Sequence, residues 1–405
     1  MVSWSNQRKF LILLVFLGPT LLGILIFNIY PISFNTYISL TNRNQFHPNP
    51  DCSVGLTGVF EPTCWGVFKE HTTRGLATPF HLQEPIYQNY SDLLGDFFTK
   101  PVLIAFFGIV VCFVPLIVAG RINKRFENQI DRPVSAGVVT LLAIALGLVL
   151  AYLLKAPAGL DLIMKSGDFF VVSFRTILYV LLCIPLFFIV GLAFALLLNS
   201  PNLPGRAFFR VALIVPWAAS TVAIMMSLVW KFFFQEHGTI NQLLSLVGGK
   251  PQIWLNDPTI SFGVVILANV WYTYPFFMVV ILGALQSIPV ELYEAAEVDG
   301  ANYWQKLVNI TLPLLRVAVI PVIILSAITT FQMFGTVWAI TEGGPSRGAG
   351  TPGATELVMV YAYKQVFRTA AYGRMGAFAV IMFVFLFGLT LYSLRVSRIT
   401  KGAYD

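Results

Sequence analysis

Long apolar runs separated by short polar stretches dominate the chain, and this alternation predicts its elements. A membrane-crossing helix needs ~20 mostly apolar residues. Eight segments meet that requirement, at roughly 10–31, 102–119, 134–154, 177–199, 211–231, 260–285, 314–339 and 375–394. Because lipid offers the backbone no hydrogen-bond partners, such segments form helices. The sequence therefore predicts an all-α polytopic membrane protein with about eight transmembrane helices.

One polar interruption between apolar runs, Glu294–Pro313, carries helical patterns of its own. Pro289 stands where a helix can begin, and acidic residues then recur opposite an apolar face. Gly300 allows a sharp turn, after which a second short helical pattern runs to Pro313. Such a helix-turn-helix would lie at the membrane surface and present acidic and apolar faces to a soluble partner. The alternative is an ordinary amphipathic connector.

The composition agrees with a membrane protein, since 57% of the 405 residues are hydrophobic and 11% are charged. The first apolar segment is too long for a signal peptide, so we expect an uncleaved span. With both termini cytoplasmic, the inner segments hold thirteen basic and seven acidic residues, and the outer segments thirteen and twelve. This asymmetry follows the positive-inside rule. The net charge of +7 thus indicates topology and not a nucleic-acid partner.

Cysteines and motifs typical of enzymes or metal sites are sparse in this sequence. Cys112 and Cys183 fall in apolar runs and are expected to be buried hydrophobes. Cys52 and Cys64 share the first outer loop, where a disulfide and two free thiols are equally open alternatives. We find no metal-ligand spacing and no Walker A loop. The sequence therefore predicts no enzymatic activity, no metal site and no nucleotide site in this chain.

Two predicted spans carry polar and aromatic groups near their middle. In the sixth span these include Asn269, Tyr272 and Thr273, next to Pro275, and in the seventh Ser326, Thr329, Thr330 and Met333 recur at spacings of three and four. Polar groups at this depth should face a cavity or the bundle interior. The alternative in the sixth span is a proline-kinked helix whose freed carbonyls are satisfied by Thr273 and Asn269. In the seventh, Ser and Thr are also common helix-packing residues.

The polar interruption also resembles a known motif. Its residues match, without a gap, the EAA loop of binding-protein-dependent ABC importer permeases: Glu294, Ala295, Ala296, Gly300, Ile310, Leu312 and Pro313. From Phe174 onward, RTILYVLL, PWAASTVAI, NVWYTYPF and EGGP resemble the carbohydrate branch of that family, which includes the maltose/maltodextrin permeases. The resemblance implies a type I importer core of six helices. It also implies that the EAA loop couples the chain to an ATPase.

The implied function is that of a permease subunit of an ATP-driven sugar importer, forming half of the pathway for a maltodextrin-like oligosaccharide. The implied partners are a second permease subunit in a heterodimer, two copies of a cytoplasmic ATPase subunit, an extracytoplasmic sugar-binding protein and membrane lipid. No cofactor is expected on this chain, since the ATPase would use ATP and Mg. The implied location is the cytoplasmic membrane, with both termini cytoplasmic.

The sugar-contacting positions of the branch fall on eight residues of this sequence: Asn269, Tyr272, Thr273, Phe276, Ser326, Thr329, Thr330 and Met333. Several of them depart from the maltodextrin pattern, which has asparagine at Thr330 and Met333, tyrosine at Phe276 and phenylalanine at Thr329. The hydrogen-bonding reach to sugar hydroxyls is therefore changed, so the resemblance does not imply the same ligand.

These observations divide the chain into five parts. They are a first transmembrane helix at 1–31, an extracytoplasmic subdomain at 32–101, a transmembrane hairpin at 102–154, the importer core at 174–395 with the coupling loop at 289–313, and a cytoplasmic tail at 396–405. Within the ABC class, another small solute is an alternative cargo. A rival of another class is an ion-driven secondary transporter, but no ionisable residue lies deep in a predicted span.

Overall fold

The structure, a computed structural model, describes residues 6–44, 46–47, 80–95, 98–125, 136–165, 167–200, 203–218, 223–348 and 351–397. The chain separates into two compact units, which are described one at a time. The first unit comprises Met1–Phe98 and Ala362–Phe385, and the second comprises Thr99–Tyr361 and Leu386–Asp405. Cys52 and Cys64 lie outside the described residues, so the disulfide stays a prediction.

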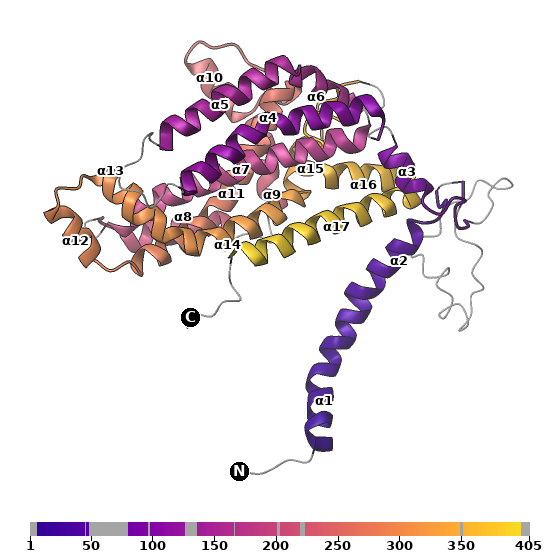
Figure 1. Cartoon of the computed structure of the whole chain (residues 1–405), viewed down its shortest axis with the longest axis horizontal. Helices are drawn as coiled ribbons and strands as arrows, with labels where there is room; N and C mark the ends of the chain where they lie inside the picture. The colour runs from indigo at the N-terminus through magenta and orange to yellow at the C-terminus, as the bar shows by residue number, and fades with distance from the viewer. Residues whose placement is uncertain are drawn as a thin grey trace. The chain divides into compact units, whose positions relative to one another are not determined.

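Regular structure in the described part is helical apart from isolated β-bridges (Figure 1). The first unit contains α1 (Asn6–Ile24), the π-helical turn η1 (Leu25–Ile29), α2 (Tyr30–Ile38) and α3 (Gln88–Leu94). The second contains α4 (Lys100–Arg125), α5 (Ala136–Leu153), α6 (Ala156–Lys165), α7 (Asp168–Asn199), α8 (Arg206–Ala218), α9 (Ala223–Phe233), α10 (Thr239–Leu246), η5 (Trp254–Asn256), α11 (Pro258–Gln286), α12 (Glu291–Val298), α13 (Tyr303–Lys306), η6 (Leu307–Thr311), α14 (Leu312–Phe331) and α15 (Gly335–Thr341). Both units share α16 (Val358–Thr369) and α17 (Tyr372–Ser397).

Six helical segments among the described residues are long and apolar enough to cross a membrane. They are Leu14–Ile38, Lys100–Asn123, Asp168–Asn199, Pro258–Gln286, Tyr303–Phe331 and Tyr372–Leu391. A bent pair, Gly137–Leu153 and Ala156–Ile163, makes a seventh if its two helices, inclined by 66°, count as one span. The all-α polytopic class expected from the apolar runs is confirmed.

One expected span is interrupted. In the other apolar run to consider, 211–231, the structure describes α8, which ends at Ala218, and α9, which begins at Ala223, and the residues between them lie outside the described part. The run 314–339 leaves the helix after Phe331 and resumes only at Gly335. Hydropathy does not detect such breaks, because the residues on both sides of each break remain apolar.

α15, which follows the break in the run 314–339, packs against α9. A Cβ atom added at Gly335 would lie 2.9 Å from Cγ1 of Ile224, closer than real Cβ contacts come. A larger residue at this position would force the Ile224 side chain to move, so glycine suits the close packing of α15 against α9.

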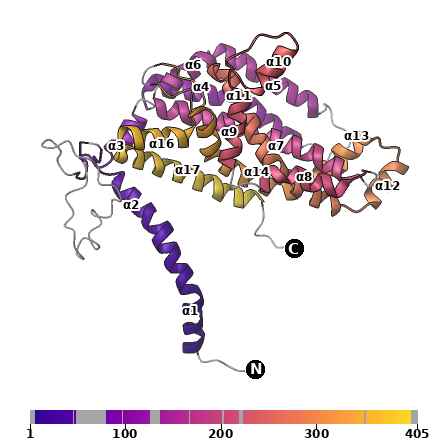
Figure 2. The ribbon, with the colours of Figure 1, turned by 180° about the vertical axis from the view of Figure 1, so that it is seen from behind.

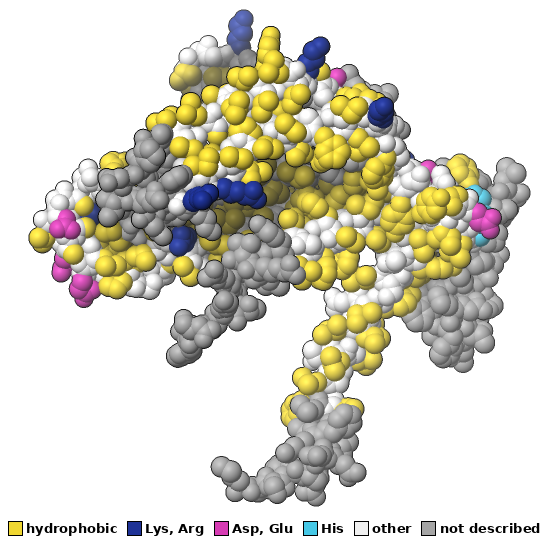
Figure 3. All heavy atoms as spheres, viewed as in Figure 1, with side chains coloured by type: hydrophobic (Ala, Val, Ile, Leu, Met, Phe, Trp, Pro, Cys, Tyr) yellow, Lys and Arg dark blue, Asp and Glu magenta, His cyan; other side chains and the backbone are white. Residues whose placement is uncertain are grey.

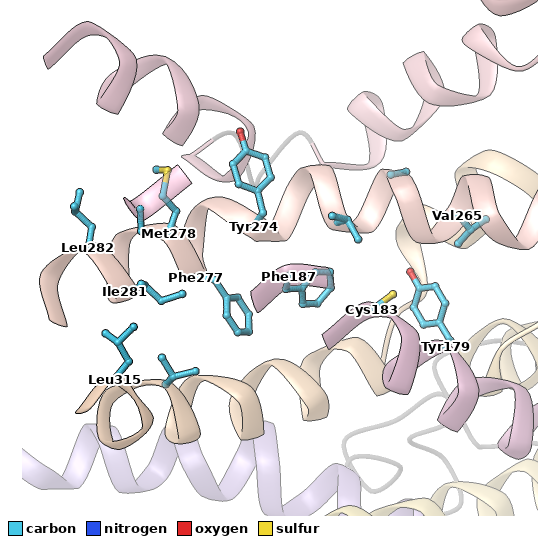
Figure 4. Close-up of a cluster of buried hydrophobic side chains, with 14 of the residues drawn as sticks. Tyr179, Cys183, Phe187, Val265, Tyr274, Phe277, Met278, Ile281, Leu282 and Leu315 are labelled. Atoms are coloured by element: carbon cyan, nitrogen blue, oxygen red, sulfur yellow. The ribbon is translucent and has the colours of Figure 1, made fainter. Parts of the chain in front are cut away.

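The core of the second unit lies between α7 and α11. Tyr179, Cys183 and Phe187 point from α7 toward α11, where Phe277 and Ile281 lie among the buried side chains (Figure 4). The backbones also approach closely, since a Cβ atom on Gly191 would lie 2.6 Å from Cβ of Phe277. Small residues at such crossings allow dense van der Waals packing, which is the main attraction between helices in lipid.

The α4–α5–α6 segment folds back on itself beside this core. Figures 1 and 2 both show α4 and α5 side by side, and α6 packs against α4 and α7. Gly147 fits against the backbone carbonyl of Cys112, and Gly159 fits against Ala105. The hairpin expected at 102–154 is thus a closely packed pair of helices that α6 connects to α7.

In the first unit, polar side chains join the end of α2 to α3 and to the start of α17. Asn89 donates hydrogen bonds of 2.8 Å to the carbonyl oxygens of Ser39 and Thr41. The Arg43 guanidinium lies 5.0 Å from the ring centroid of Tyr372. The backbone carbonyl of Arg43 accepts a hydrogen bond of 2.9 Å from the N–H of Gly373. These contacts satisfy backbone groups that no helix satisfies.

Candidate functional site

The EAA loop, residues 289–313, forms the protruding helix-turn-helix that the sequence predicts. α12 ends in a Schellman motif: the N–H of Gly300 donates to Glu297 O at 3.0 Å, and that of Ala301 donates to Ala296 O at 2.8 Å. Gly300 has a φ of +74°, in the left-handed region that disfavours other residues. The turn at Gly300 is therefore a backbone requirement, although no atom would contact an added Cβ there.

The second arm begins with a capping box. Asn302 Oδ1 accepts from Gln305 N–H at 2.9 Å, and Gln305 Oε1 accepts from Asn302 N–H at 2.7 Å. Lys306 Nζ then lies 2.5 Å from Glu297 Oε1, so an ion pair joins α13 to α12. The Glu297 side chain is 63% exposed, and an exposed pair of this kind contributes less than about 1 kcal/mol. The Schellman turn and the capping box, more than the ion pair, therefore hold α12 and α13 in their relative orientation.

A side-chain contact anchors the EAA loop to the bundle. The Tyr293 hydroxyl on α12 lies 3.0 Å from Thr311 Oγ1, just before α14. A pocket of about 330 Å³ lies beside this contact, and its lining includes Asn199, Leu285, Tyr293, Lys306 and Leu307. The EAA loop and the ends of α7 and α11 thus line one pocket.

The predicted coupling residues differ in exposure. Glu294, Ala295, Gly300 and Pro313 are exposed, whereas Ala296, Ile310 and Leu312 are half-buried. The sequence pattern puts Val298 on the apolar face of this element but does not single out Trp304, and their exposed fractions are 89% and 69%. Their position in helices too short and too polar to span a membrane is the signal that could have found them. Acidic side chains gather over the same end of the second unit (Figure 3).

Asn269, the first of the candidate sugar residues, is fully buried on α11. Its Nδ2 lies 3.7 Å from Sγ of Cys183 on α7, and its Oδ1 accepts from Thr273 Oγ1 at 3.3 Å. These partners are side chains and not the carbonyls that Pro275 leaves free. In this conformation Asn269 is a polar contact between two packed helices.

The other candidates on α11 lie nearer the surface. Tyr272, Thr273 and Phe276 are half-buried. The Phe276 ring stacks on the indole of Trp217 from α8, with centroids 5.7 Å apart and planes inclined by 17°. The sequence reasoning did not single out Trp217, which is 40% exposed. Together these side chains offer aromatic faces beside hydroxyl groups.

The candidates on α14 do not form one helical face. Ser326 and Thr330 are buried, whereas Thr329 is exposed and donates to Ser326 O at 3.1 Å. Met333 lies beyond the end of α14 and is half-buried against the core. The spacing argument fails at Met333 because the helix has already ended. α14 packs against both α11 and α7.

A cluster of buried charged side chains lies near the start of α7, and the sequence did not predict it. The expected span began at residue 177, but α7 begins at Asp168, so Arg175 lies inside the candidate span. Arg175 and Glu356 have exposed fractions of only 6% and 5%. They are 181 residues apart in the sequence, so no local pattern could have paired them.

Comparison with known proteins places these features in a family. A family model described as the inner membrane component of binding-protein-dependent transport systems matches residues 143–398. The chain is 33% identical over 240 residues to the trehalose/maltose transport system permease protein of Thermococcus litoralis, covering 59% of this chain and 78% of that protein. It is 35% identical over 236 residues to the maltose/maltodextrin transport system permease protein of Klebsiella aerogenes, covering 57% of this chain and 46% of that protein.

A solved structure gives a weaker likeness. A bacterial alginate ABC transporter, crystallised with an alginate pentasaccharide-bound periplasmic protein, superimposes with a TM-score of 0.44 at 19% identity. The superposition covers 69% of this chain and 97% of that one. Against the Klebsiella protein, by contrast, the chain spans less than half of the relative's length.

Proposed function

Because the chain belongs to the family of inner membrane components of binding-protein-dependent transport systems, we propose that it is one of two permease subunits of an ATP-driven carbohydrate importer. The single observation that carries this proposal is the EAA loop, a preorganised and exposed helix-turn-helix at one end of the second unit. The names of the relatives, which are maltose and trehalose permeases, support a carbohydrate as the cargo.

The proposed role of the EAA loop is to dock into a cytoplasmic ATPase subunit. Its exposed Val298 and Trp304 offer apolar anchors, and Glu294 adds charge beside them. Two ATPase copies would bind ATP and Mg, one under each permease, so this chain itself performs no hydrolysis. Closure of the ATPases would move α12 and α13 and, through the Tyr293–Thr311 contact, the base of α14.

The proposed cargo is an oligosaccharide of the maltodextrin type, delivered by an extracytoplasmic binding protein. Sugars present flat C–H faces to aromatic rings and many hydroxyls to hydrogen-bonding groups. Tyr272, Thr273, Phe276 and Thr329 are accessible enough to make such contacts in this conformation. Asn269, Ser326 and Thr330 are buried and Met333 half-buried, so these four would contribute only when the helices separate during transport.

The proposed topology places the EAA loop, both termini and the 126–135 loop in the cytoplasm. The excess of basic residues in these segments supports this orientation. The second permease subunit would complete the pathway opposite this chain, with lipid around both.

The test is purification of the complex through a tag on this chain from its native membrane. We expect an ATPase subunit to copurify, and the complex in lipid nanodiscs to hydrolyse ATP. Radiolabelled maltose, maltotriose and trehalose are the uptake probes, and glycerol 3-phosphate tests the alternative of another solute. Uptake driven by an ion gradient without any ATPase subunit would favour the secondary transporter instead.

Gly300→Val tests the EAA loop itself. Valine resists a φ of +74°, so the turn should fail and ATP-driven uptake should be lost while membrane insertion persists. Gly248→Val is the matched control, because Gly248 has a φ of +81° and equally open surroundings outside the EAA loop. Normal uptake by Gly300→Val in assembled complexes would remove the coupling role.

A further inference from the structure

The segment 351–358 leads into α16, and its non-helical residues are buried apart from the first. Those from Pro352 to Leu357 are all buried, and Thr355 has no exposed surface. Non-helical backbone inside a membrane protein is stable only where other protein groups satisfy its N–H and C=O groups. The partners of this segment therefore determine what holds it in place.

Three of its hydrogen bonds come from α7. Nη1 of Arg175 donates to the carbonyl oxygens of both Gly353 and Glu356. One residue further on, Thr176 Oγ1 accepts from the N–H of Val358 at 2.9 Å. Two consecutive side chains of one helix thus bond to three positions of the segment.

The segment also bonds to the residues that precede it. Thr355 N–H donates to Gly343 O at 3.2 Å, and Ala354 N–H donates to Pro345 O at 2.8 Å. The hydroxyl of Thr355 donates to Gly344 O at 2.7 Å. The segment is therefore hydrogen-bonded on two sides.

Arg175 has one charged neighbour of opposite sign and one of like sign. The Glu356 carboxylate accepts from Gly353 N–H at 3.1 Å and attracts the Arg175 guanidinium, whereas the exposed Arg347 repels it. If the segment left α7, a buried guanidinium and the Gly353 and Glu356 carbonyls would lose their partners together. Separating such groups inside a membrane protein is strongly unfavourable.

We propose that Arg175 is a positioning residue for transport: it anchors the 351–358 segment on α7, so that the two move as one rigid body throughout the transport cycle. The motion that opens the pathway then occurs elsewhere, and the seam between α7 and this segment stays closed. This inference rests on the proposed function only for the existence of an ATP-driven cycle.

The test is hydrogen exchange measured by mass spectrometry on the native complex in nanodiscs, without nucleotide and trapped with Mg-ATP and vanadate. In the unmodified complex, the exchange rate of a peptide covering 351–358 should differ by less than about twofold between the two states. A rate that rises markedly in the trapped state would show that the seam opens, and would overturn the proposal.

Variants identify the residue responsible. Arg175→Met should speed exchange of this peptide at least about tenfold and lower the maximal uptake rate per assembled complex. Arg175→Lys should restore both, because Nη1 alone makes both of the observed bonds. Arg347→Met, which changes an exposed arginine in the same cluster, should alter neither. Unchanged exchange and uptake in Arg175→Met would overturn the proposal.

Two further measurements cover the cases in which the variant does not assemble or the complex does not hydrolyse ATP. If Arg175→Met fails to assemble, Thr176→Val removes only the acceptor for Val358 N–H and should speed exchange at that amide. If the unmodified complex hydrolyses no ATP, the proposed function fails. The nucleotide-free comparison of Arg175→Met with Arg347→Met then still decides whether Arg175 anchors the segment.

Discussion

The indole N–H of Trp254 donates a hydrogen bond of 2.9 Å to Oδ1 of Asn241. The same asparagine accepts from Gln252 N–H at 3.0 Å and donates to the carbonyls of Glu236 and Gln252. Its side chain is only 3% exposed. One amide thus organises the connection between α9 and α11.

Asn241→Ala should therefore destabilise this connection. A buried partner left without its hydrogen bond costs about 1–3 kcal/mol, and several partners are lost at once. We expect a lower unfolding temperature of the purified complex. Gln242→Ala is the control, because Gln242 is exposed and makes one side-chain bond of 3.2 Å, to His237 O. Equal unfolding temperatures for the two variants would contradict the prediction.

Gly191→Ala should separate α7 from α11. The added methyl group would sit 2.6 Å from Cβ of Phe277, and overpacking of this kind costs about 1–3 kcal/mol. The expected result is a lower unfolding temperature. Gly283→Ala on α11 meets no atom within 4 Å and should be neutral or slightly stabilising, since alanine favours helix by about 1 kcal/mol over glycine.

Asn269→Ala and Tyr272→Ala should have different effects. Loss of the Asn269 amide removes the partner of Cys183 Sγ and Thr273 Oγ1, so this variant should lower the unfolding temperature. Tyr272 is half-buried, so its removal should lower maltotriose uptake while leaving the unfolding temperature nearly unchanged. Uptake and stability measured on the same preparations decide between the two roles. A stable Asn269→Ala complex with weak sugar uptake would instead indicate that Asn269 contacts the sugar.

Labelling with an impermeant thiol reagent tests the topology. In a background without native cysteines, Ser91→Cys should react from outside intact cells and Trp304→Cys should not. Both positions are exposed, so the difference reports sidedness and not burial. Asn89 is unsuitable as the outer reporter because it is buried and hydrogen-bonded. Reaction of Trp304→Cys from outside would invert the proposed orientation.

The sequence predicted the spans and the EAA loop because both depend on local patterns. Apolar runs report on lipid contact, and the spacing around Gly300 reports on a turn that forms within a few residues. The resemblance drawn from Glu294 to Pro313 is confirmed by the family match over residues 143–398. The close packing at Gly335, by contrast, depends on a neighbour, Ile224, that is more than a hundred residues away.

Long-range pairing also explains what the sequence could not predict about the candidate site. The place of Asn269 near the middle of a span was visible, but its contact with Cys183 on another helix was not. Arg175 looks like the polar end of a span until the 351–358 segment covers it. In both cases the polar residue was visible in the sequence but its partner was not.

Inside the EAA loop, the π-helical turn η6 leads from α13 into α14, and at its end Leu312 N–H bonds to Leu307 O, five residues back. Such a turn holds one residue more than the α-helical turn that could replace it. Deleting exposed Val308 should therefore let η6 close as ordinary helix and leave α13 and α14 in phase. The same deletion in the middle of α14 would rotate everything beyond it by about 100°. The loop can thus change length by one residue at this position without turning the faces of the span that follows.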